Sequence, residues 1–356
     1  MTDAKVTCPW ALLALLFATF VVLCSATLLL PHDRYIRYQQ LGETIQFHAL
    51  WDYHRIQFDE TPIDIAIIGN SRLQAGISAP QLQEGLSRQL GRPIHVANLS
   101  LAQEGRDAHY AVAKQLLANH PEVQLFILSA IEQMPRESHP AFPTIADPGD
   151  VVSAPVLLNR SYFANLATLP FRQISLTIQS LLPSAFDVSG EFDPTRYAGS
   201  DLDTSKSFDT PTGNHVDRDS IHAATELMPT ARERFESITP PMLPSRLADW
   251  EFAVERSYTR RIARLAEAND TRLAFLYVPI FHFDPPLDNQ PFYDELGTVL
   301  DARFLATDPR NYSDYGHTNR IGSARLGQWL AMQMQERGML AAGRSPPPVT
   351  QTSEAR

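Results

Sequence analysis

Short apolar runs alternate with helical patterns along most of this chain, and no other feature constrains its fold as strongly. The runs are short and uniformly apolar, so they predict buried strands at 63–68, 94–99, 124–131, 272–281 and 302–306. The patterns between and after them predict helices at 80–90, 106–120, 247–268, 291–300 and 319–337. Strands that alternate with helices form parallel βαβ units with helices on both faces of the sheet. We therefore expect an α/β fold whose mostly parallel sheet has about five strands.

The alternation is interrupted once, between about residues 135 and 244. This segment is rich in Pro, Ser, Asp and Thr, and its one amphipathic helical pattern, at 157–182, carries aromatic side chains. Residues 184–220 are polar and turn-forming, which is typical of a mobile excursion. We interpret the whole segment as an insertion over the sheet edge that carries the active site. A surface loop without a role is the alternative for 184–220.

The N-terminal region contains a long uncharged stretch at residues 10–30. As a helix of about 1.5 Å per residue it would span roughly 31 Å, close to the ~30 Å hydrocarbon core of a bilayer. A secretory signal peptide is the competing interpretation, because Cys24 to Ala26 offer small residues for cleavage. The apolar stretch of a signal peptide is usually only ~7–15 residues, so we favour an uncleaved transmembrane signal anchor. Lys5 before the stretch and Arg34 and Arg37 after it do not decide its orientation.

This anchor sets the remaining boundaries. A short tail at 1–9 precedes it, a polar, aromatic-rich connector at 31–60 follows it, and the α/β domain covers 61–337. Residues 338–356 are expected to form a disordered tail. Both cysteines, Cys8 and Cys24, lie in the anchor region, so the soluble part has no thiol and no disulfide.

Charge and composition exclude several classes of partner. The net charge of −10 leaves no basic footprint for nucleic acid. The histidines outside the motifs described below have no zinc-ligand spacing, and the chain has no phosphate-cradling glycine motif. We therefore expect no metal, no cofactor and no nucleic-acid partner.

Ser71 directly follows the first predicted strand. In an open parallel sheet, binding groups gather beyond the carboxyl ends of the strands, so we expect the Ser71 hydroxyl at that rim. Gly69 and Asn70 permit a tight turn, and the Ser71 amide can point toward a developing oxyanion. The alternative is a strand-to-helix loop in which Asn70 and Ser71 only satisfy backbone groups.

Asp314 and His317 precede the last predicted helix. Their three-residue separation lets the carboxylate reach His317 Nδ1–H, which fixes the tautomer and leaves Nε2 free to take a proton from a serine. The alternative is a solvated helix N-terminus, since aspartate and Thr318 are common caps. With Ser71, these two residues supply the three parts of a nucleophilic hydrolase or acyltransferase.

On these motifs the chain resembles the SGNH/GDSL hydrolase superfamily. Residues 69–72, Gly-Asn-Ser-Arg, are similar to its first block, and the last block is matched by Tyr312, Asp314, His317, Asn319 and Gly322. The variant that ends in Ser-Arg resembles membrane-anchored members associated with acylation of bacterial cell-envelope polysaccharides. The resemblance implies a flavodoxin-like three-layer α/β fold, with Ser71 as nucleophile, His317 as general base and Asp314 as its orienting acid.

Two blocks depart from the family pattern. The second block keeps Asn98 and Gly105, but Gly105 lies about two positions late, and Gln103 occupies the usual glycine place. The third block, residues 129–132, has no asparagine where an oxyanion donor belongs. We expect Gly105, Gln103 or the Ser71 amide to hold the oxyanion instead. Arg72 either binds an acidic substrate group or braces the turn.

Together with the resemblance, these features predict a membrane-anchored serine esterase or O-acyltransferase. The resemblance implies that its soluble domain lies outside the cytoplasm, in the periplasm. Its substrate would be an ester or acylated glycan, either an envelope polysaccharide or a lipid-linked glycan. The alternative is a non-catalytic accessory module that binds glycan or partners a membrane-bound acyltransferase.

Overall fold

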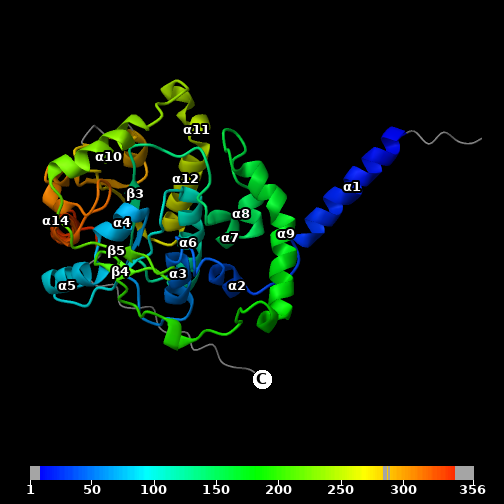
Figure 1. Cartoon of the computed structure of the whole chain (residues 1–356), viewed down its shortest axis with the longest axis horizontal. Coiled ribbons are helices and arrows are strands. Elements are labelled where there is room, and N and C mark those ends of the chain that lie inside the picture. Colours follow the sequence, from blue (N-terminus) through cyan, green and yellow to red (C-terminus); the bar gives the residue numbers. More distant parts are fainter. Residues whose placement is uncertain (1–8, 284–286, 288, 341–356) are drawn as a thin grey trace, which may run out of the picture.

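The centre of the molecule is a five-stranded sheet in which all neighbouring strands run parallel, in the order β2-β1-β3-β6-β7 (Figure 1). The computed structural model describes residues 9–283, 287 and 289–340. The strands are β1 (Ile65–Ile68), β2 (Val96–Asn98), β3 (Leu125–Ala130), β6 (Arg272–Tyr277) and β7 (Thr298–Asp301). The predicted α/β class and the five-stranded parallel sheet are confirmed.

The helices that link and flank these strands are α4 (Ser71–Gly76), α5 (Ala79–Leu90), α6 (Arg106–Asn119), α12 (Ala253–Ala268) and α14 (Arg320–Glu336). The bounds of α5, α6 and α14 lie close to the predicted ones, whereas α4 was not predicted. In α5, Ser78 caps the first turn and Gly91 ends the helix at φ 65°, a left-handed conformation that favours glycine. The pattern at 247–268 is broken at Phe252, which separates α11 (Ala248–Glu251) from α12.

One pair of predictions near the C-terminus is wrong. Residues 291–300 were expected to form a helix and 302–306 a strand, but α13 (Gln290–Asp294) ends early and the last strand is β7. Residues 303–305 form a single 3₁₀ turn, Arg303–Leu305. At Gly297 a Cβ would lie 2.5 Å from the Leu273 carbonyl oxygen, so the chain passes directly against β6 here. Pairing with β6 then decides the conformation of the residues that follow.

Both faces of the sheet are buried, which explains the uniformly apolar strands. In β1, Ala66 and Ile68 belong to one apolar cluster, and Ile65 and Ile67 belong to another. The first cluster includes residues of α6 and α12, and the second includes residues of α5 and α14. Figure 1 shows these two pairs of helices on opposite sides of the strands.

The expected connector at 31–60 is part of the folded domain. It contains α2 (Arg34–Gln39) and α3 (His48–Gln57), and most of their side chains are buried. Tyr38 Oη donates a 2.7 Å hydrogen bond to Gln115 Oε1 on α6, and Trp51 and Ile56 lie in the same apolar cluster as Ala66. Several of the buried residues in this segment are polar, so the sequence pattern predicts a connector where the structure has buried helices.

The predicted insertion contains helices and a small two-stranded sheet, joined by irregular segments. It consists of α7 (Phe142–Ile145), α8 (Pro148–Val152), α9 (Tyr162–Leu181), two 3₁₀ turns (Pro183–Ala185 and Pro194–Arg196), the antiparallel strands β4 (Phe208–Asp209) and β5 (His215–Val216), and α10 (Ala224–Glu236). The polar stretch at 184–220 contacts the domain, since Ser78 Oγ donates a 2.7 Å bond to Asp203 Oδ2. Its mobility stays a prediction.

The uncharged N-terminal stretch forms α1 (Pro9–Thr27). Within the described residues, its Trp10–Thr27 stretch is the one helical segment long and apolar enough to cross a membrane, a property that signal sequences share. Figure 1 shows α1 projecting from the domain, with its C-terminal end beside α9. Of the expected tails at 1–9 and 338–356, residues 1–8 and 341–356 lie outside the described residues, and Met339 is buried in the second apolar cluster.

Candidate active site

Ser71 lies at the point where the strand order reverses. The chain goes from β1 to β2 on one side and returns to β3 on the other, and such switch points are where open α/β sheets bind ligands. After β1 ends, Asn70 caps α4 by accepting a 3.0 Å bond from the Arg72 amide. A Cβ on Gly69 would lie 2.7 Å from Leu73 Cδ2 and 3.0 Å from Ser129 Cβ, so the chain passes tightly against both side chains here.

His317 lies on a loop that is held at both ends. The Ser313 amide donates a 2.9 Å bond to the His317 carbonyl, and Asn319 Oδ1 accepts bonds from the amides of Ile321 and Gly322 at the start of α14. A Cβ on Gly322 would lie 2.1 Å from the Asn311 carbonyl oxygen, so only glycine fits there. These contacts fix the backbone that carries His317.

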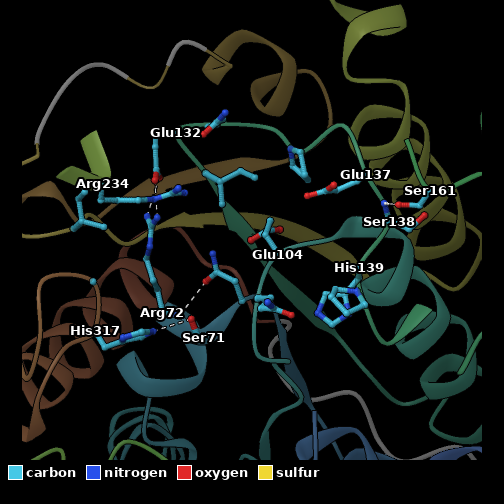
Figure 2. Close-up of a pocket in the computed structure, with 18 of the residues that line it drawn as sticks. Ser71, Arg72, Glu104, Glu132, Glu137, Ser138, His139, Ser161, Arg234 and His317 are labelled. Atoms are coloured by element: carbon cyan, nitrogen blue, oxygen red, sulfur yellow. Dashed lines mark hydrogen bonds and ion pairs between the residues drawn. The ribbon is translucent and has the colours of Figure 1, made fainter. Parts of the chain in front are cut away.

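The structure brings the three predicted residues together. His317 Nε2 lies 2.8 Å from Ser71 Oγ, although the two residues are 246 positions apart in the sequence. On the other side of the ring, Nδ1 lies 2.8 Å from Asp314 Oδ2 and 3.0 Å from Oδ1. Figure 2 shows the imidazole facing Ser71. With the proton on Nδ1 toward the carboxylate, Nε2 is the acceptor that faces the Ser71 hydroxyl.

Asp314 is held in its ionised form. Burial alone would raise its pKa, but hydrogen bonds from the His317 ring and from the backbone amides of Gly316 and His317 lower the pKa to about 2. Arg218, from the insertion, places Nη1 4.0 Å from Asp314 Oδ2 and donates a 3.1 Å bond to Ser313 Oγ. The insertion therefore contributes a positive charge beside the orienting acid.

A cavity of about 860 Å³ opens at Ser71 and His317. The cavity extends past Ser138 to Ser161 and Asn165, which lie at the start of α9 (Figure 2). Its wall is largely polar and includes five acidic or basic side chains, Arg72, Glu104, Glu132, Glu137 and Arg234. The predicted helix of the insertion thus does reach the rim that carries Ser71, through its first turn.

The Arg72 side chain binds groups of the protein itself. Its guanidinium makes two bonds to the Glu132 carboxylate, 2.6 Å and 2.8 Å long, and a third of 3.2 Å to the Val278 carbonyl. Burial would raise the pKa of Glu132, but the charge of Arg72 and its hydrogen bonds outweigh this and lower it. Of the two roles left open for Arg72, the structure favours bracing of the turn.

Glu104 is a cavity residue that the sequence did not single out. Burial and the nearby charge of Glu255 disfavour its ionised form and raise its pKa to about 8. The raised pKa favours the protonated carboxyl, which can donate a hydrogen bond. Figure 2 shows it on the cavity wall between Ser71 and Ser138. Its position next to the second block was the only sequence signal.

The predicted oxyanion residues separate into two groups. Gln103 lines the cavity with a positive φ of 71°, and its Oε1 accepts a 3.1 Å bond from Gln46. Gly105 and Asn98 do not line the cavity. A Cβ on Gly105 would lie 2.3 Å from His139 Cβ, and Asn98 Nδ2 donates to the carbonyls of Leu73 and Ile77. Both residues shape the backbone around α4 and α6.

No protein-family model matches the chain, and no curated protein matches it.

Proposed function

We propose that this protein is a membrane-anchored, SGNH-like serine esterase or O-acyltransferase that works through an acyl-serine intermediate. One observation carries the proposal: His317 Nε2 lies 2.8 Å from Ser71 Oγ, while Asp314 binds the opposite ring nitrogen. This is the arrangement by which a base activates a serine nucleophile. We also propose a flavodoxin-like three-layer arrangement. The helices on both faces of the sheet support it, as does the resemblance of the two motifs to the SGNH/GDSL superfamily.

The proposed reaction has two steps. In the first, Ser71 Oγ attacks an ester carbonyl while His317 Nε2 takes the hydroxyl proton, and the ester bond breaks as His317 returns that proton to the leaving alcohol. In the second, water or a sugar hydroxyl attacks the acyl-serine, with His317 again accepting and returning the proton. Asp314 stabilises the imidazolium that forms in both steps. Water as acceptor gives an esterase, and a sugar hydroxyl gives an O-acyltransferase.

The negative oxygen of each tetrahedral intermediate needs hydrogen-bond donors. The Ser71 amide is in the first turn of α4, where N–H groups have no acceptor within the helix. The side-chain amide of Gln103 and the protonated carboxyl of Glu104 lie on the same cavity wall. We assign the missing asparagine's role to these groups, because preorganised donors are usually the largest single catalytic term.

The substrate class follows from the cavity and the N-terminal helix. The cavity wall is polar and large enough for a sugar unit, which suits an acylated glycan better than an apolar ester. α1 would anchor the domain on the periplasmic face of the cell membrane, within reach of envelope polysaccharide or lipid-linked glycan. The family resemblance supports this location.

A fluorophosphonate probe tests the proposal, because only an activated serine reacts with it. The full chain should be labelled, and Ser71→Ala and His317→Ala should not. Ser138→Ala and Ser161→Ala are the matched controls: they remove serines from the same cavity and should leave labelling intact. Absence of labelling in the folded wild-type protein would overturn the enzymatic proposal.

A second candidate function is supported by one observation. Where the family has the third-block asparagine, this chain has Ile131, and the carboxylate of the next residue, Glu132, is occupied by Arg72. An accessory module that binds glycan, or that partners a membrane-bound acyltransferase, would need the cavity and not the oxyanion donors. Glycan binding that is equal in wild type and Ser71→Ala, without turnover in either, would favour this function.

A further inference from the structure

α9 is a two-faced helix whose apolar face is exposed. Along one side, Phe163, Phe171, Ile174, Ile178 and Leu181 are all exposed, with Phe171 and Leu181 each at 74%. The spacing of these positions is the three-to-four-residue repeat of one helix face. The opposite side contacts the domain through its buried residues, which are Leu169, Gln173 and Leu176.

This exposed face carries no charge. The only charged residue of α9 is Arg172, whose guanidinium turns away to bond the Pro143 carbonyl and Gln173 Oε1. Leu182 and Phe186, just beyond the end of the helix, are also exposed. An exposed apolar helix face of this kind on a domain marks a site of contact with protein or membrane.

The position of α9 next to α1 indicates which of these it contacts. Thr177 Oγ1 bonds the Pro31 carbonyl at 3.1 Å, and the Asp33 amide bonds Ser180 Oγ at 2.8 Å. α1 ends at Thr27, so the chain between the end of α1 and this contact spans at most about 14 Å. Figure 1 shows the C-terminal end of α1 beside α9. When α1 crosses a bilayer, this contact holds α9 at the bilayer surface.

We propose that α9 lies in the lipid–water interface beside α1, with its uncharged apolar face in the bilayer. Lipid is the occupant because it surrounds the end of α1 whenever the anchor is inserted, whether or not a partner protein is present. An interfacial amphipathic helix buries its apolar face about 5–10 Å into the boundary between headgroups and acyl chains. The proposal requires α1 to be inserted and does not depend on Ser71 being catalytic.

This placement sets the cavity close to the membrane. Asn165 lines the cavity, and Phe163, two residues away and on the other side of the helix, faces outward. The cavity rim would then lie within one helix diameter, about 10–12 Å, of the bilayer surface. A hydrophilic cavity next to the interface is within reach of a headgroup or a lipid-linked glycan.

The test uses the full chain with Cys8→Ser and Cys24→Ser, which removes both native thiols. Single cysteines are then introduced by Phe171→Cys or Leu181→Cys, with Met332→Cys as the matched control. Met332 is a partly exposed apolar residue on α14, on the side of the domain away from α1 (Figure 1). Each thiol is labelled with a polarity-sensitive fluorophore, and the protein is reconstituted in phosphatidylcholine–phosphatidylglycerol nanodiscs.

We expect blue-shifted emission at positions 171 and 181 that spin-labelled lipids quench at least twofold, and neither effect at position 332. Labels at 171 and 181 that behave like the one at 332 would overturn the proposal. Shielding that arises only when other membrane proteins are added would also overturn it, in favour of a protein partner. Thermal unfolding of each variant checks folding, and Ile178→Cys replaces any position whose variant unfolds early.

Discussion

Arg72 and Glu132, 60 residues apart in the sequence, form a two-bond ion pair that joins the residue after Ser71 to the carboxyl end of β3. Both side chains are largely buried, at 12% and 6% exposure. Arg72 also reaches the carbonyl of Val278, just after β6. The guanidinium thus connects three strand ends around the Ser71 turn, and its charge is balanced inside the protein.

This pair predicts a stability effect. Arg72→Ala leaves the Glu132 carboxylate buried without its partner, which should lower the free energy of unfolding by about 3–5 kcal/mol. Arg72→Ala combined with Glu132→Gln removes the charge left behind and should be less destabilised than Arg72→Ala alone. Urea unfolding of the four proteins measures the coupling, and strictly additive effects would contradict the role of Arg72 as a brace.

Ser71 and His317 should behave as one catalytic unit. Because the serine is activated only through Nε2, Ser71→Ala and His317→Ala should each abolish turnover of an acetyl ester while the melting temperature changes little. The double variant should be no worse than either single one, as expected for coupled catalytic groups. Multiplicative losses of kcat/KM would show that the two residues act separately.

Asp314→Asn should leave measurable turnover. The amide cannot stabilise the imidazolium or hold the tautomer as the carboxylate does, so the rate should fall by roughly 10²–10⁴-fold. Asp308→Asn is the matched control: Asp308 precedes the motif, its carboxylate binds Arg310 and Arg325, and it does not line the cavity. Equal losses in the two variants would indicate a structural role of the loop instead.

Substitution of Gly105 should lower stability, whereas substitution of Gln103 should lower turnover. Gly105→Ala forces a methyl group into His139, which should destabilise the fold by about 1–3 kcal/mol or more through overpacking. Gln103→Ala removes a donor from the cavity wall, so kcat should fall on the order of 10²-fold while stability changes by about 0.5 kcal/mol or less. If Gly105→Ala lowers kcat without a change in stability, while Gln103→Ala lowers stability without a change in kcat, then Gly105 is the oxyanion residue.

Ionisation of Glu104 should lower both the stability and the turnover of the protein at alkaline pH. Its folded pKa of about 8 lies above the ordinary value of 4.5, so the folded state holds the proton more tightly. The stabilisation is complete below pH 4.5 and is lost as the pH rises through about 8. Turnover should fall over the upper part of this range, because a carboxylate replaces a donor beside the oxyanion.

Glu104→Gln keeps a donor and cannot ionise, so this variant should retain turnover and lose the alkaline fall. Asp107 is also buried, and burial raises its pKa to about 7, so part of the stability change with pH should remain in the variant. pH profiles of kcat and of the unfolding free energy measure both effects. An unchanged alkaline fall of kcat in Glu104→Gln would contradict this role.

Local features of the sequence predicted four of the five strands of the main sheet, several helix ends and the two motifs. The strands of a sheet covered on both faces are apolar throughout, and Ser78 and Gly91 mark the ends of α5 through hydrogen bonds and backbone angles of adjacent residues. Asp314 and His317 are three residues apart, so their contact is local and predictable. That Ser71 meets them followed from the rule that parallel strands end at one rim.

What only the tertiary structure decided depends on residues distant in the chain. The position of β7 is set by pairing with β6, and the place of α3 in the core by the helices that pack around it. The raised pKa of Glu104 depends on burial and on Glu255, and the role of Gly105 depends on the approach of His139. Composition and spacing record local conformational preference, whereas burial and charge pairing arise only when separate segments exclude water from each other.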